Sequence, residues 1–219
     1  MKDVIMPYKL YYSPGACSLA AHIVLREVGA EFDLERVPAR NGPLEASYLA
    51  INPKGFVPAL ALDGEDRVLT ELPAILVFLA RRYSVAALLP SDPTMEARCH
   101  EWIAWLSGWV HAVGFALLWR PGRFSSDSRQ HETLTKQGFE IVRNAFNDIE
   151  RQFADGRNWA VPDAYSIADP FLLVLYRWGN RIGIPMASSY PAWTQVSYRT
   201  AARPAVLEAL KQEGISIEA

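Results

Sequence analysis

A cysteine between a short strand pattern and a helix pattern has the clearest chemical potential in this chain. Cys17 follows the turn residues Ser13, Pro14 and Gly15, and it opens an apolar helical pattern that Gly29 ends. Free N–H groups and the positive end of the helix dipole stabilise a thiolate at a first helical turn, below the reference pKa of about 8.5. We therefore expect a nucleophile or a donor that stabilises a thiolate. The alternative is a small hydrophobic side chain packed under a turn.

The residues around Cys17 exclude several other chemistries. A dithiol redox motif needs a second cysteine three positions earlier, where this chain has Pro14. A nucleophile elbow needs a second glycine where this chain has Leu19, and no Gly-Lys-Ser or Gly-Lys-Thr phosphate loop occurs. A site with a single thiol beside a helix N-terminus remains.

Composition limits the class of protein. The chain has 219 residues, half of them hydrophobic, which is enough for one large domain or two small ones. With a net charge of −2 the chain has no overall positive charge to attract nucleic acid, which is therefore excluded as a partner. Only Cys17 and Cys99 are cysteines, which argues for a reducing compartment, with Cys99 an inert buried thiol. No signal-peptide core is evident at the N-terminus, so we expect the cytoplasm.

Residues 102–119 contain no Asp, Glu, Lys or Arg and just reach the length of a membrane span. Ser107 and Gly108 interrupt the run, and its tryptophans are spread along it instead of gathering at both ends. We therefore expect no membrane association. The run is typical of a central bundle helix that packs on its own domain and on a partner subunit.

The first eighty or so residues alternate between strand and helix patterns, in the order βαβ and then ββα. Strands are expected at 8–12, 31–37, 57–62 and 67–70, with helices at 17–28 and 73–83 and a short helix within 41–50. The first helix is expected to be amphipathic, with His22, Arg26 and Glu27 opposite its apolar face.

After residue 83 only helical patterns follow, at 93–119, 127–153, 166–182, 191–200 and 204–213. Ser166 and Asp169 form a capping-box signature, and we expect both to be structural and buried. The sequence predicts an α/β plus all-α fold: a thioredoxin-like domain over 1–84, a linker over 85–93 and an all-helical domain over 94–219.

Four motifs carry a family resemblance. They are the segments 12–18 and 52–58, the pair Thr70-Glu71 before a helix, and the segment 166–169. Together and in this order they resemble the cytosolic glutathione S-transferase family, and Cys17 with His111 resembles its bacterial beta class. The resemblance covers nearly the whole chain and implies glutathione as co-substrate, a small electrophilic substrate and a homodimer.

The resemblance also implies roles for single residues. Cys17 and His111 would be catalytic, and the Val57-Pro58 bond would be cis, with the backbone of Val57 pairing with the cysteinyl residue of glutathione. Glu71 would bind the γ-glutamyl ammonium, and the adjacent helix N-terminus its carboxylate. The glutathione-binding set is Tyr12, Arg40, Val57, Pro58, Glu71 and Leu72, with Arg40 proposed for the glycyl carboxylate.

The chain departs from the family pattern after Glu71. Leu72 stands where serine or glycine is common and offers no hydroxyl, and Pro73 has no N–H, so carboxylate recognition could be weaker. No metal is implied, because His100 lies eleven residues before His111, about 16 Å along a helix. The remaining aromatic residues of interest are expected in the core or in a substrate-pocket wall: Trp109, Phe115, Trp119 and Phe124.

The sequence favours conjugation of the glutathione thiolate to small hydrophobic electrophiles. Two alternatives stay open: a glutathione-dependent thiol transferase or peroxidase with Cys17 as redox nucleophile, and a non-catalytic ligand-binding or partner-binding module of the same fold. The identity of the electrophile cannot be read from these residues.

Overall fold

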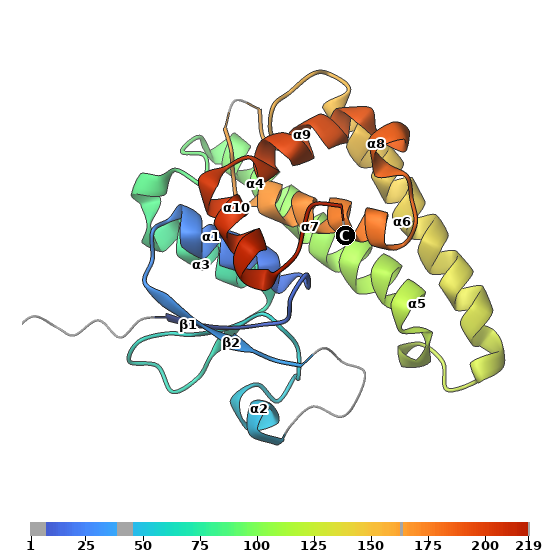
Figure 1. Cartoon of the computed structure of the whole chain (residues 1–219), viewed down its shortest axis with the longest axis horizontal. Coiled ribbons are helices and arrows are strands. Elements are labelled where there is room, and N and C mark those ends of the chain that lie inside the picture. The colour runs from blue at the N-terminus through green and yellow to red at the C-terminus, as the bar shows by residue number, and fades with distance from the viewer. Residues whose placement is uncertain (1–7, 39–45, 163, 219) are drawn as a thin grey trace, which may run out of the picture.

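The computed structural model describes residues 8–38, 46–162 and 164–218 (Figure 1). Its sheet has the strand order β2-β1-β3-β4. Strand β1 (Tyr8–Tyr12) pairs in parallel with β2 (Phe32–Arg36) and antiparallel with β3 (Ala59–Ala61), which pairs antiparallel with β4 (Leu69–Thr70). The expected thioredoxin-like arrangement is confirmed. Strand β3 starts two residues later than expected, because Pro58 has no N–H to donate to a ladder.

Helices cover both faces of this sheet. Alternation along β1 directs Leu10 toward α1 (Ser18–Glu27) and α3 (Leu72–Arg82), where it shares the main core with Leu60. Tyr11 points to the other face and packs against Tyr48 of α2 (Ala46–Ile51). Strands β1 and β4 end on the same side of the sheet, so α1 and α3, which follow them, begin near each other.

The expected polar side of α1 is not exposed to solvent. His22 is fully buried, and Glu27 forms an ion pair with Arg203, with Nε–Oε1 at 2.6 Å. Helix α10 (Pro204–Glu213), red in Figure 1, lies against α1 and accounts for this burial. The charged residues of α1 therefore form contacts within the fold.

A long helical stretch forms the wall opposite the sheet. It consists of α4 (Pro93–Trp105), the π-helical segment η2 (Leu106–Phe115) and α5 (Ala116–Trp119). Helix α6 (His131–Phe153) runs beside it, and both extend away from the sheet (Figure 1). A Cβ on Gly138 of α6 would lie 2.5 Å from the backbone N of Leu118, so these helices approach closely. By length and composition alone, Pro93–Trp119 could also cross a membrane.

The last helices are α7 (Ala168–Arg181), α8 (Met186–Ser189), α9 (Pro191–Ala201) and α10, and short 3₁₀ turns occur at Ser84–Ala86, Pro121–Arg123 and Ser128–Gln130. Helix α7 is buried along most of its length and packs against α1, α4 and α9. The expected helical C-terminal region is confirmed, while the boundaries at residues 84 and 93 stay a prediction.

The capping box before α7 has the expected geometry. Asp169 Oδ2 accepts hydrogen bonds from the Ser166 N–H at 2.8 Å and its hydroxyl at 3.1 Å, and Oδ1 accepts from the N–H of Ala160 at 2.8 Å. Both side chains are buried. Burial raises the pKa of Asp169 to about 6 despite these hydrogen bonds. The two residues serve to start the central helix.

Candidate active site

The turn between β1 and α1 is held by hydrogen bonds from three distant parts of the chain. The Ser13 hydroxyl donates to the carbonyl of Val37 at 2.6 Å. The Gly15 N–H donates to Glu213 Oε2 at 2.8 Å, and the Gly15 carbonyl accepts from Trp178 Nε1 at 2.8 Å. Gly15 adopts φ +69°, a conformation that costs glycine little. The turn that presents Cys17 is therefore fixed on both sides of Gly15.

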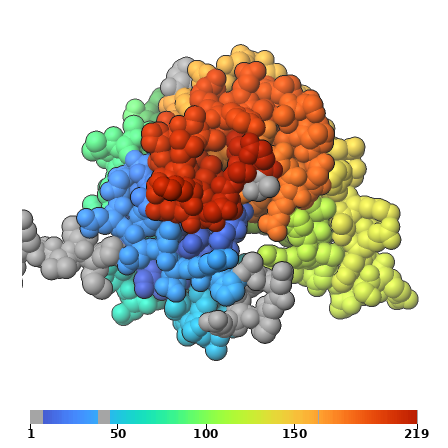
Figure 2. Space-filling view, viewed as in Figure 1, coloured from blue at the N-terminus to red at the C-terminus, as the bar shows by residue number. Residues whose placement is uncertain are grey.

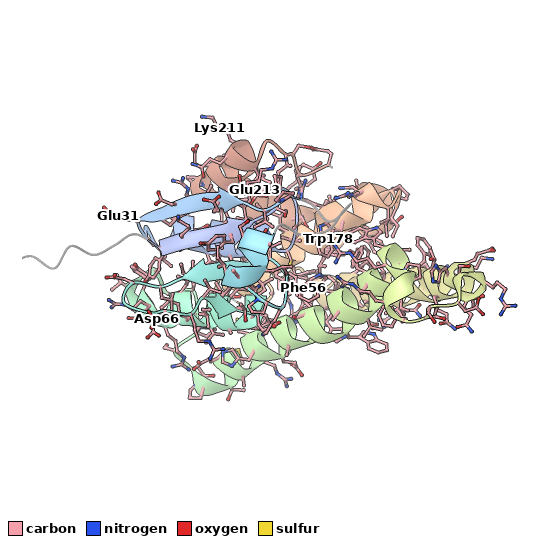
Figure 3. All side chains as sticks on the ribbon, turned by 90° about the horizontal axis from the view of Figure 1, so that it is seen from below. Glu31, Phe56, Asp66, Trp178, Lys211 and Glu213 are labelled. Atoms are coloured by element: carbon pink, nitrogen blue, oxygen red, sulfur yellow. The ribbon has the colours of Figure 1, made fainter. Side chains whose placement is uncertain are left out.

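Glu213 and Trp178 come from α10 and α7, and both are labelled in Figure 3. The side chain of Glu213 is fully buried and also pairs with His22, with Oε1–Nδ1 at 3.0 Å. His22 Nε2 lies 2.8 Å from Oε1 of Gln212. The C-terminal helix thus supplies the acceptor for the Gly15 amide, which the sequence analysis did not anticipate.

Cys17 lies directly before α1, at its N-cap position, as expected. Its Sγ donates a hydrogen bond to the carbonyl of Val57 at 3.4 Å. Burial raises the pKa of the Cys17 thiol to about 12, although the N–H groups of Cys17 and Ser18 and the charge of Arg120 act in the opposite direction. The expected lowering of this pKa is wrong, because desolvation outweighs the helix N-terminus. Cys17 is thus a protonated donor at neutral pH.

A cavity of about 590 Å³ opens in front of Cys17. Its residues come from the turn before α1, from α2 and the segment that follows it, from the start of α3, and from η2, α5 and α7. In Figure 2 the surface is hollowed between the blue N-terminal part and the green segment that contains α5. Figure 3 labels Phe56 and Trp178, which both line the cavity. The site therefore lies between the sheet-containing part and the helical part.

Glu71 lines this cavity from the residue before α3. Its φ of +71° lies in a region that disfavours any side chain, so the carboxylate is held there at a conformational cost of about 1–3 kcal/mol. Lys54 Nζ pairs with Glu71 Oε1 at 2.7 Å and donates to Thr70 Oγ1 at 3.0 Å. Both charged side chains are more than half exposed, so this pair is weak and open to exchange.

Leu72 is the first residue of α3 and also lines the cavity, although its side chain is buried in the core. Pro73 follows it within the first turn. The Ile75 N–H already donates to the carbonyl of Glu71, so Leu72 and Ala74 carry the free amides of this turn. Replacing serine or glycine by Leu72 therefore removes no backbone donor.

His111 lies in η2 on the opposite wall of the cavity. Its ring contacts Trp178 and Phe171, with centroids 5.0 and 6.3 Å apart. Burial lowers the pKa of His111 to about 4, and the charges of Arg120 and Arg123 act in the same direction. His111 is therefore a neutral imidazole near pH 7.

The other predicted site residues have different outcomes. Pro58 lines the cavity and its bond to Val57 is cis, as expected. Tyr12 does not line the cavity: its place in β1 directs its ring toward His22, with centroids 6.2 Å apart, so its assignment to glutathione is withdrawn. Arg40 lies outside the described residues. Within the described ranges, no group of three His, Cys, Asp or Glu side chains could hold a metal ion.

The aromatic residues also divide between two settings. Phe115 and Trp119 line the cavity, whereas Trp109 and Phe124 lie elsewhere, with exposed fractions of 49% and 46%. Cys99 is buried as expected. Four further residues of the cavity were not predicted from the sequence: Arg120, Arg123, Trp178 and Arg181. Trp178 and Arg181 lie one turn apart on α7, whereas Arg120 and Arg123 follow α5, so the wall that they share depends on how these elements pack.

Comparisons with known proteins agree with this geometry. The family model described as glutathione S-transferase, N-terminal domain, matches residues 15–82. The chain is 34% identical over 212 residues to glutathione S-transferase GstA of Escherichia coli O157:H7, which covers 94% of this chain and 99% of that protein. A structure of a glutathione transferase homologue from Sulfitobacter with bound glutathione is 31% identical, with a TM-score of 0.86 and coverage of 96% and 99%. A bacterial beta class glutathione S-transferase from Sphingomonas chungbukensis is 38% identical, with a TM-score of 0.81 and coverage of 95% and 100%.

Proposed function

Because this chain belongs to the glutathione S-transferase family, we propose that it conjugates the thiolate of glutathione to small hydrophobic electrophiles. The observation that carries the proposal is the contact between Cys17 Sγ and the carbonyl of Val57 at the floor of the cavity. It places a protonated thiol beside Val57, a residue of the cavity lining whose backbone can pair with a peptide.

Glutathione would bind along the sheet-containing wall. Its γ-glutamyl ammonium would pair with Glu71, replacing Lys54 in a weak exposed contact. The adjacent α-carboxylate would accept hydrogen bonds from the free amides at the start of α3, chiefly that of Leu72. The N–H and carbonyl of Val57 would pair with the cysteinyl residue, which places the glutathione sulfur next to Cys17.

Cys17 would then act as a hydrogen-bond donor. The glutathione thiol loses its proton to solvent. The Cys17 S–H then turns from the Val57 carbonyl and donates its hydrogen bond to the thiolate, in the field of Arg120. The thiolate attacks the electrophilic carbon, a carbon–sulfur bond forms, and the leaving group departs with its electron pair. His111, neutral on the opposite wall, would border the electrophile. A Cys17 pKa of about 12 favours this role over that of a redox nucleophile.

Two substitutions test the role of Cys17. Cys17→Ser keeps a hydroxyl donor, whereas Cys17→Ala removes it. We expect conjugation to persist in the serine variant and to fall about 10–100-fold in the alanine variant, as when one donor to a developing anion is removed. The thiol transferase reading predicts a different result. The wild type would then reduce disulfides faster than it conjugates electrophiles, and both variants would lose disulfide reduction equally. Calorimetric titration with reduced glutathione comes first, because every catalytic role requires glutathione to bind. Absence of binding would favour a non-catalytic binding module.

We further propose that two chains pair through the helical stretch Pro93–Trp119. Trp109 exposes 49% of its surface there, and Ala104 and Gly108 beside it are also exposed. A Cβ at Gly108 would meet no atom within 4 Å, which leaves room for close approach by a second copy. Sedimentation should give a dimer that Trp109→Glu dissociates, and a monomeric wild type would contradict this.

A reducing cytoplasm remains the compartment that we propose.

A further inference from the structure

Arg177 of α7 is a buried cation for which the proposed chemistry has no use. It exposes 3% of its surface. Its guanidinium lies against the open side of Gly15, because a Cβ on that glycine would stand 3.3 Å from Nη1 and 3.7 Å from Nη2. Burial lowers the pKa of Arg177, and the charge of Glu213 acts in the opposite direction. The cation therefore packs on the same glycine that Glu213 and Trp178 hold by hydrogen bonds.

The C-terminal tail, residues 215–218, runs from the end of α10 toward α7 and supplies acceptors to it (Figure 1). Arg177 Nε donates to the carbonyl of Ser216 at 2.5 Å. About one turn further along α7, Asn180 Nδ2 donates to the carbonyl of Ile217 at 3.2 Å, and the side chain of Ile217 is buried in the main core. The tail is therefore anchored on α7 next to Arg177.

The contact between Arg177 and Gly15 limits the movement of the turn that carries Cys17. Protein interiors are close-packed, so a guanidinium that touches a glycine leaves its backbone little room to shift. The donors of a guanidinium are fixed in one plane, and the bond from Nε to Ser216 sets the orientation of that plane. An arginine side chain has several rotatable bonds, so without this acceptor it regains rotamer freedom and leaves its place against Gly15.

We propose that Arg177 is a positioning residue for Cys17 and that the C-terminal tail keeps Arg177 in place. The contacts run from Ser216 through Arg177 to Gly15, and Cys17 follows two residues later. Loss of either contact frees the turn, which makes the thiol more accessible and more reactive and a poorer donor to the thiolate of glutathione. The inference goes beyond the proposed conjugation, because the reactivity of Cys17 is measured without any substrate.

Alkylation by iodoacetamide separates a local effect from a global one. Cys17 reports on the turn, and Cys99 of α4, which is fully buried, reports on opening of the core. Mass spectrometry gives the rate at each cysteine in the same sample. Global destabilisation accelerates the reaction of both thiols, whereas release of the turn accelerates that of Cys17 alone. The ratio of the Cys17 rate to the Cys99 rate is therefore the readout.

Arg177→Met keeps an unbranched apolar chain and removes the guanidinium. We expect the alkylation ratio to rise about tenfold. The kcat for conjugation should fall about tenfold, with KM for glutathione changed less than about twofold, because the donor is misplaced while the binding residues remain. The matched control is Arg199→Met on α9, where the guanidinium also donates to a backbone carbonyl, that of Asn158. This control should keep the wild-type ratio and kcat.

A chain that ends at Gly214 lacks the tail and should change the ratio and kcat in the same direction as Arg177→Met. The two changes combined should have no more effect than Arg177→Met alone, because the tail acts through Arg177. If the shortened chain does not fold, Asn180→Ala takes its place in this comparison. It removes only the donor to the Ile217 carbonyl, so the expected rise in the ratio is about threefold.

An alkylation ratio that stays at the wild-type value in Arg177→Met would overturn the inference, whatever the loss of stability. Effects of the tail and of Arg177 that multiply in the combined variant would also overturn it, because the tail would then act on the turn without Arg177. Absence of conjugation in the wild type would overturn the proposed function, and the alkylation ratios would still decide the inference.

Discussion

Glu213→Gln removes a hydrogen-bond acceptor from the support of the active-site turn without changing the size of the side chain. In the wild type, Oε2 accepts from the Gly15 N–H at 2.8 Å and Oε1 lies 3.0 Å from His22 Nδ1, with the side chains of Glu213 and His22 fully buried. An amide has one oxygen and one NH₂ group. Its NH₂ must therefore face either the Gly15 N–H or the ring nitrogen of His22.

The cost follows from this geometry. If the NH₂ faces Gly15, two donors meet and a buried N–H loses its acceptor, which costs about 1–3 kcal/mol. If it faces His22, Nδ1 must accept instead of donate; the Nε2–H can then donate to Gln212 Oε1 at 2.8 Å, but the charge-assisted hydrogen bonds of the carboxylate are lost. We expect the free energy of unfolding to fall by about 2 kcal/mol. The kcat/KM for glutathione should fall about tenfold, because Cys17 lies two residues after Gly15 and loses its fixed position.

Urea unfolding and steady-state kinetics with glutathione measure the two effects. Glu208→Gln is the matched control, since Glu208 lies on the same helix, has a side chain that is 45% exposed and approaches Lys211 only at 4.0 Å. Free energies of unfolding that agree within about 0.5 kcal/mol among the wild type and both variants would refute the reasoning. A lower stability with unchanged kinetics would show that Glu213 supports the fold without positioning Cys17.

Three further predictions concern charge, thiol reactivity and packing. Unfolded His111 binds a proton below about pH 6.5, and folded His111 does so only below about pH 4. Protonation of the unfolded chain at His111 should therefore lower the free energy of unfolding by about 2 kcal/mol between pH 7 and pH 5. Urea unfolding of His111→Gln should show a shallower pH dependence, and an identical slope would contradict this. Iodoacetamide should alkylate Cys17 at pH 7.5 at least about 100-fold more slowly than free cysteine, followed by mass spectrometry, and a comparable rate would mean a thiolate. Gly138→Ala should lower the free energy of unfolding by about 2 kcal/mol, because its Cβ would lie 2.5 Å from the Leu118 N and 2.8 Å from the Gly114 carbonyl; thermal unfolding at the wild-type temperature would show that α6 can shift.

Local patterns predicted most of the fold because they depend on neighbours in sequence. The strand at Tyr8–Tyr12 and the helix after Cys17 end within one residue of their expected bounds. The π-helical segment η2 was not predicted, because its periodicity differs little from that of an α-helix and no Pro or other local signal marks it. The 3₁₀ turns and α8 were missed as well, since elements of three or four residues carry too few positions for periodicity.

Long-range contacts explain what the sequence could not predict in the site. Glu213 and Gly15 are 198 residues apart, and Trp178 reaches the same glycine across 163 residues. The family motifs located Cys17, Val57, Glu71 and His111, which all line one cavity. Tyr12 was assigned from its place in a motif, yet strand alternation directs its ring into the core. Motifs identify positions in the chain, whereas the face that a side chain occupies depends on packing.

The same distinction explains the pKa of Cys17. A helix N-terminus favours a thiolate wherever the thiol stays in water, and this was the basis of the expectation from sequence. Here the thiol is buried beside the Val57 carbonyl, in a turn that α7 and α10 hold at Gly15, so desolvation outweighs the helix. A buried thiol keeps its proton and can donate it in a hydrogen bond to another sulfur. The positive end of α1 is then available to a thiolate that arrives with the ligand. Weakening the contacts at Gly15 should therefore make Cys17 more reactive itself and less effective as a donor, two effects of opposite sign from one substitution.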